Sequence, residues 1–131
     1  MLENSGEGEK MLEIRVQNGR TVAVIADKEK VITDAQSALD LIMTAKYEAG
    51  TNLLAVDKEA ICEDFFILSR GLAGEVLQKF INYHAKIAIF GDFSMYTSKP
   101  LKDFIYESNQ GKDVFFLGTM EEAVERLSLT K

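Results

Sequence analysis

The sequence contains few of the residues that build disulfides and transition-metal sites. Its 131 residues include one cysteine, one histidine, one proline and no tryptophan. A lone Cys62 cannot form a disulfide within the chain, which is typical of proteins in a reducing compartment. A zinc site needs several Cys or His ligands, so a site built from those residues is excluded.

Long hydrophobic runs are also missing. Apolar stretches such as 52–56 and 87–90 have the length of a strand, whereas a membrane-spanning helix needs about 20 residues. The first ten residues are polar and acidic and contain no apolar signal core. We therefore predict a cytoplasmic protein without a membrane partner, and a disordered tail over residues 1–10.

The third absence is a cluster of positive charge. Fifteen Lys and Arg residues stand against 21 Asp and Glu residues, and the formal net charge is −6. Contacts with the phosphate backbone dominate the affinity of proteins for nucleic acids. Because the basic residues here are few and scattered, the sequence predicts no nucleic-acid partner.

Hydrophobic periodicity predicts one α/β domain over residues 11–131. The segments with strand character are 12–16, 21–26, 52–56, 86–90 and 113–117. The turn pair Asn18–Gly19 joins the first two into an antiparallel hairpin. Helical patterns separate the later strands, which implies parallel pairing with right-handed crossovers. We expect a single-layer, mixed, mostly parallel five-stranded sheet with helices on its faces.

Capping residues mark the starts of the helices. Asp34, Ser98 and Thr119 precede helical patterns, and each side-chain oxygen can accept a hydrogen bond from a free backbone N–H. Gly50 is a natural end for the first helix. The apolar residues of that helix recur at helical spacing up to Tyr47.

Polar side chains follow the predicted strands at their carboxyl ends. Asp57, Asp92, Ser94 and Thr119 occupy such positions. Open α/β sheets bind ligands at this edge, so a polar crevice for a small ligand, a divalent ion or a phosphate is one interpretation. The alternative is that these residues only cap turns and helices, which the capping box that begins at Thr119 favours for that residue.

A second candidate site lies where a helix begins after the third strand. The segment Ser69-Arg70-Gly71-Leu72-Ala73-Gly74 offers backbone N–H groups and a helix dipole to an anion, and the guanidinium of Arg70 suits a carboxylate or phosphate. The alternative is a helix cap with tight packing at Gly71 and Gly74. The Gly-Lys-Ser/Thr ending of a nucleotide-binding loop is absent.

Other reactive or aromatic residues are weaker candidates. His84 ends a helix, where the dipole favours a cation, and acidic neighbours disfavour a reactive thiolate at Cys62. Phe93, Met95 and Tyr96 follow a strand in a loop, where exposed side chains would line a pocket or a partner surface.

Three blocks carry a resemblance to a known family. Val31–Leu41, Glu63–Glu75 and Gly91–Asn109 resemble an uncharacterised bacterial family that is catalogued only as a domain of unknown function. The resemblance extends over residues 11–127 and implies no activity.

The order of elements, and the arrangement strand, Asp, loop, Ser-x-Gly-Leu, helix from Val56 to Leu72, are similar to the STAS domains of anti-sigma-factor antagonists. This resemblance implies a STAS-like fold and a regulatory role. In those domains a partner kinase phosphorylates a Ser or Thr at this helix N-terminus, and Ser69 corresponds by position. This chain departs from that pattern in two ways, since the loop between Asp57 and Ser69 is longer and Arg70 replaces a small residue.

Together these observations favour a non-enzymatic regulatory or binding module that recognises a protein partner or a small anion. No nucleophile–base pair, metal motif or nucleotide loop is found in the sequence, so we assign no catalytic residue, metal or cofactor. The predicted binding residues are Asp57, Ser69, Arg70, Gly71, Asp92, Ser94 and Lys99.

Two alternatives stay open. One is a small enzyme or ligand sensor, in which Asp57 and Asp92 act as acid–base groups or cation ligands while Ser94 and Lys99 orient the substrate. The other is a homodimer, formed through the edge of the first hairpin or an apolar helix face.

Overall fold

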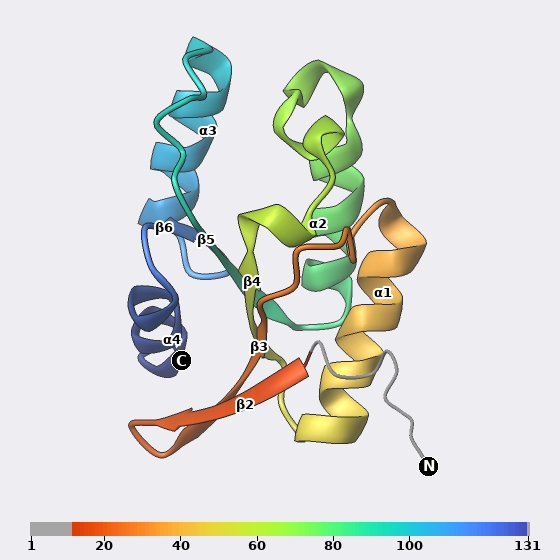
Figure 1. Cartoon of the computed structure of the whole chain (residues 1–131), viewed down its shortest axis with the longest axis vertical. Coiled ribbons are helices and arrows are strands. Elements are labelled where there is room, and N and C mark those ends of the chain that lie inside the picture. The colour runs from red at the N-terminus through yellow and green to blue at the C-terminus, as the bar shows by residue number, and fades with distance from the viewer. Residues whose placement is uncertain (1–11, 131) are drawn as a thin grey trace.

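The computed structural model describes residues 12–130, which form a five-stranded sheet with helices on both faces (Figure 1). The strands are β2 (Leu12–Gln17), β3 (Arg20–Ile25), β4 (Leu53–Asp57), β5 (Lys86–Phe90) and β6 (Val114–Leu117). They lie side by side in chain order; β2 is antiparallel to β3, and all other neighbours are parallel. The predicted mixed sheet is confirmed, while the predicted tail lies outside the described residues.

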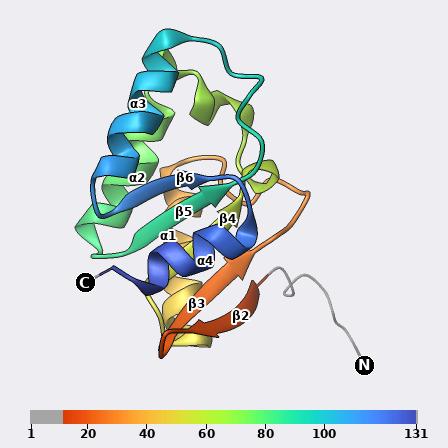
Figure 2. The ribbon, with the colours of Figure 1, turned by 90° about the vertical axis from the view of Figure 1, so that its left-hand side faces the viewer.

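The helices divide unequally between the two faces. They are α1 (Ala35–Thr44), α2 (Leu72–Asn82), α3 (Lys99–Gln110) and α4 (Met120–Ser128). Helices α1, α2 and α3 lie on one face, with α3 at its β6 margin, and α4 alone covers the other (Figures 1 and 2). Within residues 12–130, no helix has both the length and the apolar content needed to cross a membrane.

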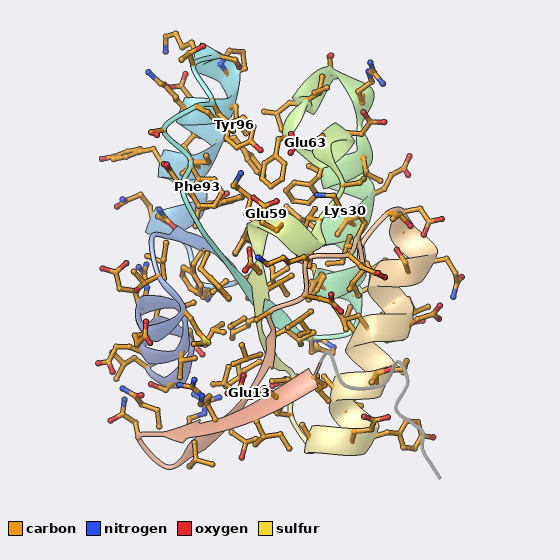
Figure 3. The ribbon with its side chains drawn as sticks, in the orientation of Figure 1. Glu13, Lys30, Glu59, Glu63, Phe93 and Tyr96 are labelled. Carbon is orange, nitrogen blue, oxygen red and sulfur yellow. The ribbon has the colours of Figure 1, made fainter. Side chains whose placement is uncertain are left out.

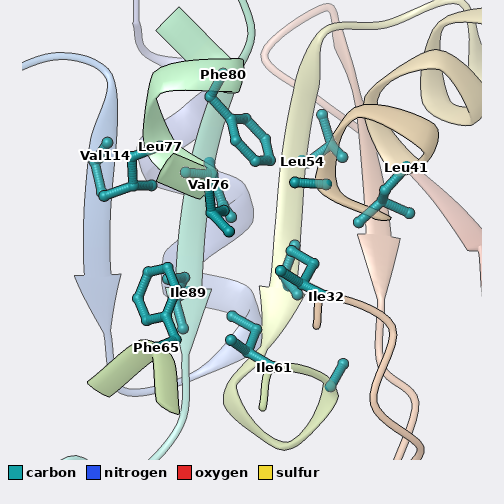
Figure 4. Close-up of a cluster of buried hydrophobic side chains, with 14 of the residues drawn as sticks. Ile32, Leu41, Leu54, Ile61, Phe65, Val76, Leu77, Phe80, Ile89 and Val114 are labelled. Carbon is teal, nitrogen blue, oxygen red and sulfur yellow. The ribbon is translucent and has the colours of Figure 1, made fainter. Parts of the chain in front are cut away.

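Side chains of the central strands alternate between two apolar cores. On β4, Leu54 belongs to the larger core under α1 and α2 (Figure 4), and the adjacent Leu53 belongs to the smaller core under α4. On β6, Phe116 and Phe115 divide in the same way, and both are buried. A sheet covered on both faces therefore buries adjacent residues of one strand.

The predicted hairpin turn and helix caps are present at the predicted residues. Asn18 and Gly19 both adopt positive φ, at 52° and 75°, as a two-residue hairpin turn requires. The Asp34 carboxylate accepts a bond of 2.8 Å from the backbone N–H of Ser37 and starts α1. Thr119 likewise caps α4, which confirms the structural alternative for that residue.

The end of the first helix differs from the prediction. After Thr44 the helix continues as a π-helical turn, Ala45–Ala49, in which each turn contains more residues than in an α-helix. This change of period places Ala45 in the core and leaves Tyr47 88% exposed. The helical spacing that runs up to Tyr47 in the sequence therefore does not correspond to a continuous buried face.

The two edges of the sheet end differently. At β6 the side-chain amide of Asn109, from α3, donates to the Phe116 carbonyl at 3.1 Å and accepts from its N–H at 2.7 Å. The outward backbone groups of Phe116 are thereby satisfied. At the opposite edge, no strand among residues 12–130 pairs with the outer side of β2.

Candidate functional site

The carboxyl edge of the sheet is formed by the connections that follow β3, β4 and β5. A short parallel bridge between Ile32 and Ile61 joins the first two connections. The ammonium of Lys30 donates to the carbonyl of Glu59 at 3.0 Å and reinforces that join. The connection after β4 contains three short 3₁₀ turns, Lys58–Ala60, Glu63–Phe66 and Leu68–Arg70.

An aromatic cluster, formed by Phe66, Phe93 and Tyr96, joins the β4–α2 connection to the loop after β5 (Figure 3). The rings of Phe66 and Tyr96 stack with centroids 4.9 Å apart and an interplanar angle of 17°. The Tyr96 hydroxyl donates to the Glu63 carboxylate at 3.2 Å. These contacts fix residues 91–98, which we call the 91–98 loop, against the β4–α2 connection.

Lys58 lies beneath this loop and is almost fully buried, with 8% of its side chain exposed. Its ammonium is 5.2 Å from the centroid of the Tyr96 ring, which is within the range of a cation–π interaction. Its nearest carboxylate oxygen belongs to Glu59, at 3.6 Å, and the Met95 sulfur is 3.9 Å away. A buried charge is costly, and these contacts offset part of the cost of taking the ammonium out of water.

Gly91 makes room for Lys58. The register of β4 and β5 pairs Asp57 with Phe90, so the residues that follow them are neighbours. Gly91 has a φ of +148°, and a Cβ atom there would lie 3.0 Å from the Cβ of Lys58. Glycine thus meets both a backbone and a packing requirement at this point.

Three of the predicted site residues, Asp57, Asp92 and Ser94, lie at this edge and form two turns. Asp57 accepts from the Glu59 N–H at 2.8 Å, and Asp92 accepts from the Ser94 N–H at 2.9 Å. Hydrogen bonds from the Ser94 hydroxyl and N–H, with a smaller contribution from the charge of Lys58, lower the pKa of Asp92. The carboxylate of Asp92 therefore stays negative over a wide range of pH.

The other predicted residues lie elsewhere. Ser69 and Gly71 are exposed at the end of the β4–α2 connection, and Arg70 pairs with Asp64 at 3.4 Å on the surface. Lys99 pairs with Asp103 at 2.7 Å on α3. Among residues 12–130, no hydrogen bond or ion pair joins Ser69–Gly71 to the Asp57 and Asp92 turns, so a shared site stays a prediction.

Lys58 is the residue of this edge that sequence reasoning missed. A lysine directly after a strand resembles an ordinary surface residue, because lysine is rarely buried. The detectable signal was the glycine that ends the neighbouring strand, since parallel strands in register place Gly91 beside Lys58. Among the described residues, no group of three or more His, Cys, Asp or Glu side chains is arranged to hold a metal ion.

Replacing Gly91 tests the packing of Lys58. We expect Gly91→Ala to lower the free energy of unfolding by roughly 1–3 kcal/mol, because the new Cβ meets Lys58 in a strained backbone conformation. Gly74→Ala is the matched control, since Gly74 lies inside α2 with open space around it and should gain up to about 1 kcal/mol. Urea unfolding measures both values, and equal effects would contradict the packing argument.

The ionisation of Tyr96 tests the aromatic cluster. Burial and the nearby charge of Glu63 raise the pKa of Tyr96 from 10.0 to about 12. The folded state thus holds this proton more tightly than the unfolded state, so the stabilisation is complete below pH 10 and is lost as the pH rises towards 12.

Ultraviolet titration of tyrosinate should show a step near pH 12. We expect Tyr96→Phe to remove this step and Tyr106→Phe, on the exposed surface of α3, to leave it in place. A step that survives in Tyr96→Phe would place the raised pKa on another tyrosine.

Comparisons with known proteins identify the family of this chain and assign it no activity. No curated protein matches this chain. The chain is similar to the crystal structure of a Thermotoga maritima protein provisionally described as an anti-sigma factor antagonist. The two are 12% identical, with a TM-score of 0.43 over 90% of this chain and 95% of the other. The model of a family described as a domain of unknown function, DUF4180, matches residues 17–127, and the chain therefore belongs to that family.

Proposed function

We propose that the chain is a regulatory binding module that recognises a basic segment of a protein partner through the 91–98 loop. The observation that carries this proposal is the position of Met95, which is 66% exposed between two residues of a tightly held loop. Methionine is frequent at protein-binding surfaces because its flexible, polarisable side chain adapts to a partner.

The 91–98 loop is ordered by its own contacts before any partner binds. The Gly91 N–H donates to the Leu117 carbonyl at 3.0 Å, and the Tyr96 N–H donates to the Phe93 carbonyl at 3.1 Å. The Asp92 turn and the aromatic cluster further restrain the 91–98 loop. A loop already held in one conformation loses little conformational entropy on binding, which favours its use as a recognition surface.

The charge around Met95 favours a basic partner. Carboxylates of Asp57, Glu59, Glu63 and Asp92 lie at this edge of the sheet. Of the nearby cations, Lys58 is buried, Lys30 donates to the Glu59 carbonyl, and Arg70 is paired with Asp64. Complementary charge steers association and excludes partners of the same sign, so a basic segment fits this surface better than an acidic one.

Met95→Lys tests this surface. A photoreactive residue at position 95 would first identify the contacting protein in an extract of the organism, and the purified partner would then be titrated with each variant. We expect Met95→Lys to weaken binding at least about tenfold, because a central apolar contact is lost and a positive charge faces the basic segment. The control, Leu129→Lys, alters a similarly exposed residue just after α4 and should change affinity less than about twofold. Equal losses in both variants would refute the assignment.

A small anion at Lys58 is the second candidate. The ammonium is buried, and among the described residues no oxygen lies within hydrogen-bonding distance of it, since Glu59 is 3.6 Å away. An anion that entered between Lys58 and the backbone of the 91–98 loop would supply the missing acceptor.

Calorimetric titration with inorganic phosphate tests this second candidate. We expect Lys58→Met, which keeps the length of the side chain, to weaken binding at least about tenfold, while Lys99→Met leaves it unchanged. No heat of binding with the unaltered protein would rule out phosphate at Lys58 and would leave the protein-binding proposal standing.

A further inference from the structure

We propose that the open edge of β2 binds the β2 strand of a second copy of this chain, antiparallel, about a two-fold axis at Ile14. The pairing would join two five-stranded sheets into one continuous sheet. This surface belongs to the first hairpin and is separate from the 91–98 loop, so the inference does not rest on the proposed function.

The two sheet edges differ in whether their backbone groups are satisfied. At β6 the Asn109 side chain bonds both outward groups of Phe116. At β2 no described element covers the outer side of the strand, which runs along the lower margin of the sheet (Figure 2). An open edge with free N–H and C=O groups is a template for another strand.

The hairpin determines which residues of β2 present those groups. In a two-residue hairpin the pair that flanks the turn, here Gln17 and Arg20, exchanges both backbone bonds, and the pairs then alternate. Val16 pairs with Thr21, whose carbonyl accepts from Thr51 on the β4 side. Val16, and by alternation Ile14 and Leu12, therefore direct their N–H and C=O groups to the open edge.

Charge selects one register among those that this alternation allows. With Ile14 opposite Ile14 of the second copy, Glu13 lies opposite Arg15 in both directions. Shifting the register by one residue in each chain places either Glu13 or Arg15 opposite itself, and like charges directly opposite are destabilising. The register centred on Ile14 is thus self-complementary, and the 3.1 Å ion pair between Glu13 and Arg15 within one strand has an equivalent across the interface.

The apolar side chains fit the same register. Ile14 and Val16 are 51% and 69% exposed, because α1 lies over the central strands and reaches β2 only near Leu12. Val16 of the second copy would lie opposite Leu12, which lines a pocket of about 370 Å³ between β2 and α1. Pairing would therefore remove exposed apolar surface from water along the whole length of the strand.

Charge reversal provides the first test. Sedimentation equilibrium of the full chain at nanomolar to high micromolar concentrations should show a reversible dimer. We expect Glu13→Arg, and separately Arg15→Glu, to raise the dissociation constant at least about tenfold, since each places like charges opposite twice. The double variant Glu13→Arg/Arg15→Glu should return to within about threefold of the original value, which a loss of folding would not allow.

Cross-linking tests the register itself. In a Cys62→Ala background, we expect Ile14→Cys to form an intermolecular disulfide on mild oxidation, because the two Cα atoms would be about 5.5 Å apart. Val16→Cys is the control, since its copies would be about 14 Å apart and should not link. A monomer at all concentrations, a dimer that charge reversal leaves unchanged, or equal linking at both positions would overturn the proposal.

Discussion

Burial of both faces of the central strands is the constraint on which the rest of this structure depends. Every residue of β4 before Asp57, and every residue of β5 after Lys86, is buried. The face beneath α4 contains Ala55 and Ala88, and such small residues let one short helix lie close to the sheet. Polar and charged groups can begin only where each strand ends, so the chemistry of the fold gathers at the strand ends.

The same constraint explains why the loops at the carboxyl edge support one another. Parallel strands in register end together, and the first residues beyond them, Lys58 and Gly91, become neighbours although 33 positions separate them in the chain. The Lys58 stem packs against Gly91 and its ammonium reaches the Tyr96 ring. The order of the 91–98 loop thus follows from the register of two buried strands as much as from the loop sequence.

Features that depend on neighbouring residues in the chain were predictable from the sequence. The Asn18–Gly19 turn, the Asp34 and Thr119 caps and the alternation of strands with helices are all present, because a few adjacent residues determine each of them. Features that depend on distant contacts were not predictable in this way. The burial of Lys58 requires the β4–β5 register, and the exposure of Tyr47 requires a π-helical turn that periodicity alone does not reveal.

The candidate site shows the same division. The Asp57 and Asp92 turns lie where the strand ends indicated, and Ser69–Gly71 lies near the start of α2 as expected. The apolar residues of the loop after β5 differ in a way that no spacing rule indicates, because Phe93 and Tyr96 pack against the core while Met95 is mostly exposed. Their directions are determined by Phe66, which comes from a different connection.

Asn109 has a consequence for the solubility of this fold. A sheet with two unsatisfied edges can add strands at both ends, which is the first step towards open-ended fibres. Here the side-chain amide of Asn109, from α3, forms at the β6 edge the two hydrogen bonds that the backbone of a further strand would otherwise form with Phe116. Growth from the remaining edge stops after one addition, because the added molecule presents its own Asn109-capped margin. A single asparagine at one edge thus limits any edge-to-edge association to two molecules.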